Sequence, residues 1–149
     1  MICAISFFTH MPAATWARWL KSISCFLARE GVLIFTTHGR AALKTMGVER
    51  HAVKDGFLFF HHSEQKDLAL DDYGSTVSFF EFVFQQAANI GLRVIRFQEA
   101  GVGYQDLIVL TPEWESSPAV NQNGTDERIR LFGRLFRLLR ARLLLRDRP

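Results

Sequence analysis

Residues 33–39 read LIFTTHG, an apolar run that ends abruptly in two threonines, a histidine and a glycine. Upstream, SFFTHMP at 6–12 repeats this change, because an apolar run again ends in Thr-His. An apolar run without polar alternation is typical of a strand buried on both faces of a sheet. The two segments therefore predict buried strands over 2–8 and 32–37, each followed by polar side chains.

The residues between these runs have helical spacing. Pro12 suits the first position of a helix, and Gly31 suits its end. Apolar residues recur at intervals of three and four over 13–29: Trp16, Trp19, Leu20, Ile23, Phe26 and Leu27. A strand, a helix and a strand with short connections form a βαβ unit, so the two strands should be parallel. His10 and His38 then lie at the same sheet edge, roughly 5–10 Å apart.

The next segment of the chain predicts smaller elements. A short helix is expected near 40–46, an extended stretch at 56–62 and a loop over 68–76. Ser78 and Glu81 have the Ser-x-x-Glu spacing of a capping box, in which the serine hydroxyl caps a helix start. We therefore expect a helix that begins at Ser78.

The helix predicted after Ser78 should end near Gly91, which suits a C-terminal cap. Strand-like segments at 92–98 and 104–111 follow, joined by EAGVG, and this short connection predicts a β-hairpin. The domain thus predicted covers 1–111 and belongs to the α/β class.

Composition indicates a folded chain. Its 149 residues are 48% hydrophobic and 22% charged, which is typical of one globular domain. Cys3 and Cys25 form no metal or redox motif; we expect Cys3 in the core and Cys25 on the surface. No basic residue precedes the first apolar run, and no run approaches a membrane span, so a cytoplasmic location is expected.

The positive charge is concentrated at the C-terminal end. Residues 126–149 carry eight arginines and three acids, a local charge of +5, so the first 125 residues carry −2 of the net +3. A polar linker is expected at 112–125 and an arginine-rich amphipathic helix at 126–146. Such a helix can pack on its own domain, dock on a partner, or lie peripherally on an anionic membrane. No nucleic-acid partner is expected, because the segment has no recognisable reader motif.

The order of these segments resembles the second half of a class I S-adenosylmethionine-dependent methyltransferase, in particular the bacterial members that act on small molecules. Phe8-Thr9-His10-Met11-Pro12 is similar to the phrase in which the family's fourth strand ends, and LIFTTHG is similar to the end of its fifth. Further matches, in chain order, are Arg29-Glu30-Gly31, Asp72-Tyr73-Gly74-Ser75-Thr76, Ser78-Phe79-Phe80-Glu81 and Gly103-Tyr104-Gln105-Asp106. The resemblance covers about residues 2–111.

The resemblance implies a partial Rossmann-like sheet, made of the family's strands four to seven with the last strand antiparallel. It implies methyl transfer from S-adenosylmethionine to a small-molecule, sugar or lipid-like acceptor. The residues it points to are Ser6, Thr9 and His10 for cofactor binding, and Thr37, His38 and Tyr73 for substrate binding. His10 is the candidate base, because it lies nearest the point where strand order reverses.

The family's glycine-rich cofactor loop is missing from this pattern. Gly101-x-Gly103 lies between two hairpin strands, whereas a loop that cradles a cofactor must lead from a strand into a helix. We interpret this pair as a tight turn. The sequence therefore predicts a methyltransferase fragment that is inactive alone.

The predicted strand at 2–8 would have a neighbour on one side only. An open apolar edge favours pairing with a partner chain or self-association. A second interpretation therefore stays open, namely a non-catalytic interaction module that uses this edge or the basic C-terminal helix.

A metal site is the weakest reading of the histidines. The candidate ligands would be His10, His38, His61 and His62. Helical i, i+4 spacing and a neighbouring cysteine are both missing from this set, so no metal is predicted. The alternative for both Thr-His pairs is that they only end a strand and begin a turn.

Overall fold

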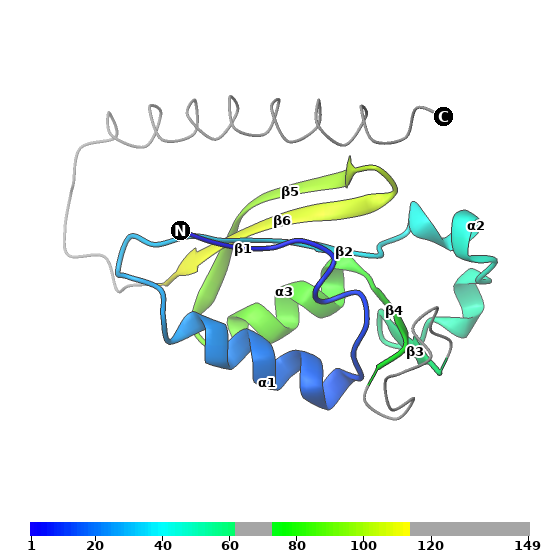
Figure 1. Cartoon of the computed structure of the whole chain (residues 1–149), viewed down its shortest axis with the longest axis horizontal. Coiled ribbons are helices and arrows are strands. Elements are labelled where there is room, and N and C mark those ends of the chain that lie inside the picture. The colour runs from blue at the N-terminus through cyan, green and yellow to red at the C-terminus, as the bar shows by residue number, and fades with distance from the viewer. Residues whose placement is uncertain (62–72, 114–149) are drawn as a thin grey trace. The chain divides into compact units, whose positions relative to one another are not determined.

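The computed structural model describes residues 1–61 and 73–113 (Figure 1). The predicted arginine-rich helix at 126–146, nearly all of the predicted linker, most of the predicted loop at 68–76, and His62 lie outside the described residues.

Four strands form the main sheet in the order β1-β2-β6-β5. They are β1 (Ile2–Ala4), β2 (Leu33–Thr37), β5 (Leu92–Val102) and β6 (Gln105–Pro112). β1 and β2 are parallel, as the βαβ pattern predicts, and β6 is inserted antiparallel between β2 and β5. The predictions of an α/β fold, of the hairpin and of an antiparallel last strand are confirmed.

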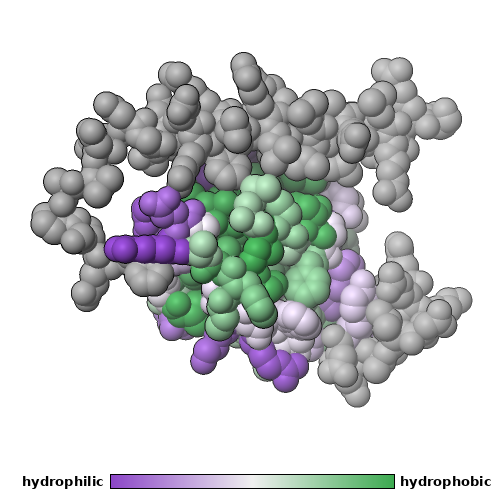
Figure 2. All heavy atoms as spheres, turned by 60° about the vertical axis from the view of Figure 1, so that its left-hand side comes forward, coloured by the Kyte–Doolittle hydropathy of each residue, from purple (hydrophilic) through white to green (hydrophobic). Residues whose placement is uncertain are grey.

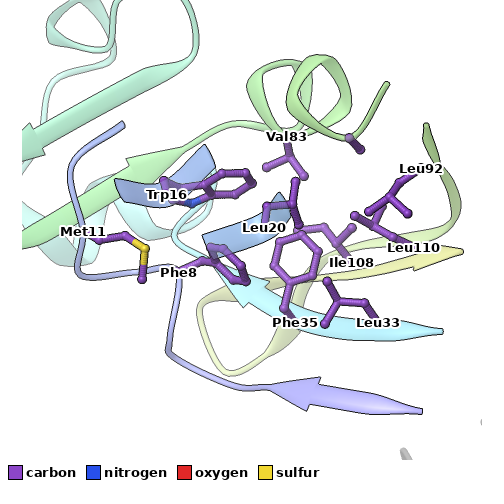
Figure 3. Close-up of a cluster of buried hydrophobic side chains, with 11 residues drawn as sticks. Phe8, Met11, Trp16, Leu20, Leu33, Phe35, Val83, Leu92, Ile108 and Leu110 are labelled. Atoms are coloured by element: carbon purple, nitrogen blue, oxygen red, sulfur yellow. The ribbon is translucent and has the colours of Figure 1, made fainter. Parts of the chain in front are cut away.

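Two helices pack on the same face of this sheet, as Figure 1 shows: α1 (Ala13–Ser24) and α3 (Phe80–Ala88). Trp16 and Leu20 of α1 and Val83 of α3 meet side chains from β2 and β6 in one buried cluster (Figure 3). Phe8 and Phe35 join the same cluster, with ring centroids 4.9 Å apart. Burial of this aromatic and aliphatic surface is the main force that holds the helices on the sheet.

The helix α1 ends earlier than the apolar spacing predicts. The N–H groups of Cys25, Phe26 and Leu27 each bond the carbonyl three residues earlier, so the last turn tightens. A tighter turn rotates successive side chains further, which takes Phe26 off the buried stripe and leaves it 82% exposed. Trp19 is also 45% exposed, and its ring packs edge-on against Phe7.

The predicted strand over 2–8 is only β1, and its burial on both faces is wrong. After Ala4 the chain turns, Ser6 adopts a φ of 55°, and its N–H donates to Thr36 Oγ1 instead of extending the ladder. The turn directs Phe8 into the core. Because β1 is the edge of the sheet among the described residues, Cys3 is exposed, which contradicts its predicted core position. Cys25 is exposed, as predicted.

A second, two-stranded sheet pairs β3 (Phe57–Phe60) with β4 (Ser75–Ser78) in antiparallel register. The prediction of an extended stretch at 56–62 is confirmed over β3. β4 replaces the end of the predicted loop, because its backbone also pairs with the end of β2 through a bridge between His38 and Val77. The helix α2 (Ala42–Met46) lies where a short helix is predicted, and a 3₁₀ turn, η1 (Arg50–Ala52), follows it.

The predicted capping box at Ser78 is wrong. Ser78 is the last residue of β4, the N-cap position is Phe79, and no side chain caps the helix α3. The Ser78 N–H donates to the His38 carbonyl, and Glu81 pairs with Arg40 instead of reaching back. The serine hydroxyl is buried with no hydrogen-bond partner among the described residues. Strand pairing therefore replaces capping here.

The hairpin turn is tighter than EAGVG, because β5 continues to Val102 after register shifts that accommodate extra residues. Gly103 has a φ of 60°, the left-handed conformation expected of a tight turn. At Gly101 the glycine is needed for close packing instead, since a Cβ there would lie 2.8 Å from Leu107 Cβ. No helix within the described ranges 1–61 and 73–113 is long and apolar enough to cross a membrane.

Candidate functional site at the ends of β1 and β2

Two histidines meet where β1 and β2 run out. His38 directly follows β2, and His10 follows the turn after β1. Their ring centroids lie 6.3 Å apart with the planes nearly perpendicular. This separation falls within the range that parallel strands predict, so the sequence echo of Thr-His does mark neighbouring positions in space.

Both imidazoles are held by one short segment, made of Gly74 and the strand β4 that follows it. His10 Nδ1 lies 3.0 Å from the carbonyl oxygen of Gly74, and His38 Nδ1 lies 3.0 Å from that of Thr76. A carbonyl oxygen only accepts, so each Nδ1 carries the hydrogen. In the neutral rings Nε2 then has the free lone pair, and each histidine offers one acceptor or proton-binding atom.

The backbone of Gly74 and β4 also bonds the segment that follows β1. The N–H groups of Gly74 and Thr76 donate to the carbonyls of His10 and Thr9, and the Thr76 hydroxyl donates to the Met11 carbonyl at 2.7 Å. Sequence patterns gave no sign of this arrangement, because the segment before Ser78 reads as a polar loop.

Each histidine is stacked on a tyrosine. The Tyr73 ring lies 4.9 Å from that of His10 with planes 11° apart, and the Tyr104 ring lies 5.6 Å from that of His38 with planes 24° apart. Tyr73 is a predicted substrate-binding residue, and in the structure its ring packs on that of His10. Tyr104 is missed by the sequence reasoning. Its signals in the sequence are its place beside Gly103 and the family match at Gly103-Tyr104-Gln105-Asp106, neither of which marks it as a site residue.

His38 is more enclosed than His10. Its side chain is 6% exposed, and burial lowers its pKa below the ordinary value of 6.5, against the opposing effect of the Thr76 carbonyl. The positive charge that His10 can carry lowers the pKa of His38 further. His38 is therefore neutral at pH 7, with Nε2 as an acceptor.

Gln105 joins the two walls of the site and is also missed by the sequence reasoning. Its Nε2 lies 3.0 Å from Ser6 Oγ and 3.5 Å from His38 Nε2. Ser6, a predicted cofactor-binding residue, is exposed and presents its hydroxyl at this point. The amide therefore spans from the turn after β1 to the end of β2.

The two predicted threonines directly precede the two histidines and are buried. Thr9 and Thr37 are 0% and 1% exposed, so neither offers surface to a ligand in this conformation. The Thr9 hydroxyl donates to the Ser6 carbonyl at 2.9 Å and stabilises the turn. In this arrangement Thr9 supports the site residues around it.

A buried carboxylate lies beside the site. Asp106 is 2% exposed, accepts the Ala100 N–H at 3.0 Å, and packs so closely on Gly39 that a Cβ there would lie 1.7 Å from Oδ2. Burial raises the pKa of this carboxyl above its ordinary value, while the Ala100 N–H acts in the opposite direction. Glycine after His38 is thus a packing requirement.

Metal ligands do not cluster in the part of the chain that the structure describes: no group of three or more histidine, cysteine, aspartate or glutamate side chains could hold an ion there. His61, which follows β3, packs edge-on against Phe59, with ring centroids 5.1 Å apart.

No family model matches the sequence, and no curated protein matches it significantly.

Proposed function

We propose that the chain is the C-terminal half of a class I methyltransferase-like domain, whose parent activity is methyl transfer from S-adenosylmethionine to a small-molecule, sugar or lipid-like acceptor. The observation that supports this most is the strand order β1-β2-β6-β5, with β6 antiparallel. It is the arrangement expected for strands four, five, seven and six of that family. It also brings His10 and His38 to one edge, where open α/β sheets bind ligands.

S-adenosylmethionine supplies an electrophilic methyl group on a sulfonium when bound. In the proposed arrangement, Ser6 and His10 line the cofactor side, and His38 and Tyr73 line the acceptor side. His10 Nε2 has no hydrogen-bond partner among the described residues, so it is the candidate acceptor of a proton from the nucleophile. The contribution of these side chains is mainly to position the acceptor for in-line attack.

The described residues fit only one wall of such a cofactor site. Within residues 1–61 and 73–113, no strand leads through a glycine-rich turn into a helix, and Gly101 and Gly103 belong to a hairpin. We therefore propose that the rest of the cofactor site comes from outside these residues, and that this chain is inactive alone.

Complementation tests this proposal. Binding of S-adenosylhomocysteine is measured by calorimetry for the chain alone and after mixing with a separately expressed N-terminal half of a class I methyltransferase. We expect binding only in the mixture, weakened by His10→Ala and unchanged by His51→Ala, which alters an exposed histidine. A mixture that forms a stable complex without binding the ligand refutes the cofactor proposal.

The second candidate function is a non-catalytic interaction module, and the edge strand β1 favours it. In the parallel ladder the Ile2 N–H donates to Val32, so the backbone groups of Cys3 point to the open edge. Met1 and Ile5, which flank β1, are 68% and 41% exposed. Figure 2 shows that apolar side chains gather on one face of the molecule, with hydrophilic ones toward its margin.

Sedimentation velocity tests self-association at this edge. If β1 recruits a second copy, the chain self-associates, and Cys3→Pro abolishes this because proline removes the outward N–H. Cys25→Ser is the matched control at another exposed cysteine. A wild-type chain that stays monomeric at high micromolar concentration rules out self-association at this edge.

The arginine-rich segment at 126–146 supplies the other proposed contact. We propose a cytoplasmic protein that this segment holds at an anionic membrane surface. Co-sedimentation with vesicles of mixed neutral and anionic lipids, with and without residues 126–149, measures this contact. Equal binding by both chains refutes it.

A further inference from the structure

The side chain of Gln105 contacts both Ser6, in the turn after β1, and His38, at the end of β2. Gln105 is the first residue of β6, and its amide exchanges hydrogen bonds with Ser6 Oγ at 3.0 and 3.1 Å. The same amide nitrogen lies 3.5 Å from His38 Nε2, at the long end of hydrogen bonding. An amide has two N–H donors, so one can serve each partner.

The hydrogen bond to the Thr76 carbonyl determines which end of the Gln105 amide can face His38. Because that carbonyl takes the hydrogen on His38 Nδ1, neutral His38 has its lone pair on Nε2. Only the NH₂ end of Gln105 can then face Nε2 favourably, which agrees with the observed orientation. A donor directed at a neutral imidazole stabilises that form over the protonated one.

We propose that Gln105 is a positioning residue, which holds His38 as a neutral Nε2 acceptor, links it to Ser6, and is displaced by an acceptor that donates a hydroxyl or amine hydrogen. Only the displacement rests on the proposed function, because the hydrogen bonds exist in the chain without a ligand. The acceptor class that follows carries an O–H or N–H group, since only such a group can replace the amide donor at His38 Nε2.

Among the described residues, few other titratable groups lie close enough to His38 to change its pKa. The titratable rings that pack against it are His10, at 6.3 Å, and Tyr104, at 5.6 Å between centroids. The neighbouring Asp106 directs its carboxylate to Gly39 and the Ala100 N–H. A change at Gln105 should therefore appear in the His38 titration and leave the fold intact.

Nuclear magnetic resonance of the full chain with isotope-labelled histidine tests the proposal. Gln105→Glu replaces the donor with an acceptor, so the midpoint of the His38 titration should move upward, with Nε2 gaining the proton. Gln105→Asn shortens the amide beyond reach, so it should move the midpoint in the same direction by less. Gln85→Glu adds the same charge on the exposed face of α3 and should leave His38 unchanged.

The result separates this inference from the proposed function, because no cofactor or acceptor is present in the titration. An unchanged His38 midpoint in folded Gln105→Asn and Gln105→Glu overturns the positioning role, whatever the chain binds. A shift in His38 without cofactor binding in the complemented mixture keeps the positioning role and refutes the methyltransferase.

Discussion

Replacing Ser78 with alanine should stabilise the protein, although a sequence-based reading predicts the opposite. As the cap of a helix, Ser78 would contribute about 0.5–2 kcal/mol, which alanine would remove. In the structure its hydroxyl is fully buried with no partner among the described residues, and such a group costs about 1–3 kcal/mol in lost hydration. Losing the small packing contribution of one oxygen offsets a few tenths of this. We expect Ser78→Ala to raise the free energy of unfolding by about 1 kcal/mol.

Thr76 provides the matched control, because it lies on the same strand with the same burial and its hydroxyl is bonded to the Met11 carbonyl. Thr76→Val keeps the side-chain shape and should lower the free energy of unfolding by about 1–3 kcal/mol, since it leaves that carbonyl unpaired. Urea denaturation followed by circular dichroism measures both changes. A loss of stability in Ser78→Ala comparable to that in Thr76→Val would refute the reasoning.

Three further predictions concern packing and pH. Gly39→Ala should lower the free energy of unfolding by about 1–3 kcal/mol, because the added Cβ clashes with the Asp106 carboxylate. In an Asp106→Ala background the same change should be neutral or slightly stabilising. A double-mutant cycle measured by urea denaturation tests both expectations. Because the folded chain holds His38 with a lowered pKa while the unfolded chain protonates it from about 6.5 downward, stability should fall as pH decreases below 6.5. His38→Gln should flatten that slope, and exposed His51→Gln should not. Trp16→Phe should lower the free energy of unfolding by less than the ~3–5 kcal/mol typical of replacing a buried aromatic side chain with alanine, because phenylalanine keeps most of the ring volume and the change removes a buried indole N–H that has no hydrogen-bond partner among the described residues; a melt showing the full cost contradicts this.

The parts of the fold that were predictable depend on contacts close in sequence. The buried run of β2, the apolar spacing around Trp16 and Leu20, and the short hairpin connection each define their own element. The early stop of β1 was not predictable, because Ser6 turns to reach Thr36, a partner distant in the chain. The capping box failed for a similar reason, since pairing between β3 and β4 uses Ser78 in a strand.

The candidate site was predictable only where residues follow a strand directly. His10 and His38 could be placed at one edge because parallel strands end together. Tyr104 and Gln105 could not, because they enter the site from the hairpin, whose insertion beside β2 brings residues more than sixty positions apart into contact. The tautomers of the two rings were equally unpredictable, since they are set by the carbonyls of Gly74 and Thr76, which are distant in the sequence.

The two carbonyls that hold the histidines lie on Gly74 and Thr76, two positions apart along a single extended segment. Side-chain and backbone directions in such a segment repeat every two residues, so a slip by one position would disengage both rings together. Local opening of β4 should therefore release both histidines from their hydrogen bonds in one step. States in which only one of the two rings is held should be rare. Assembly of this edge is thus a cooperative event governed by the stability of one short strand.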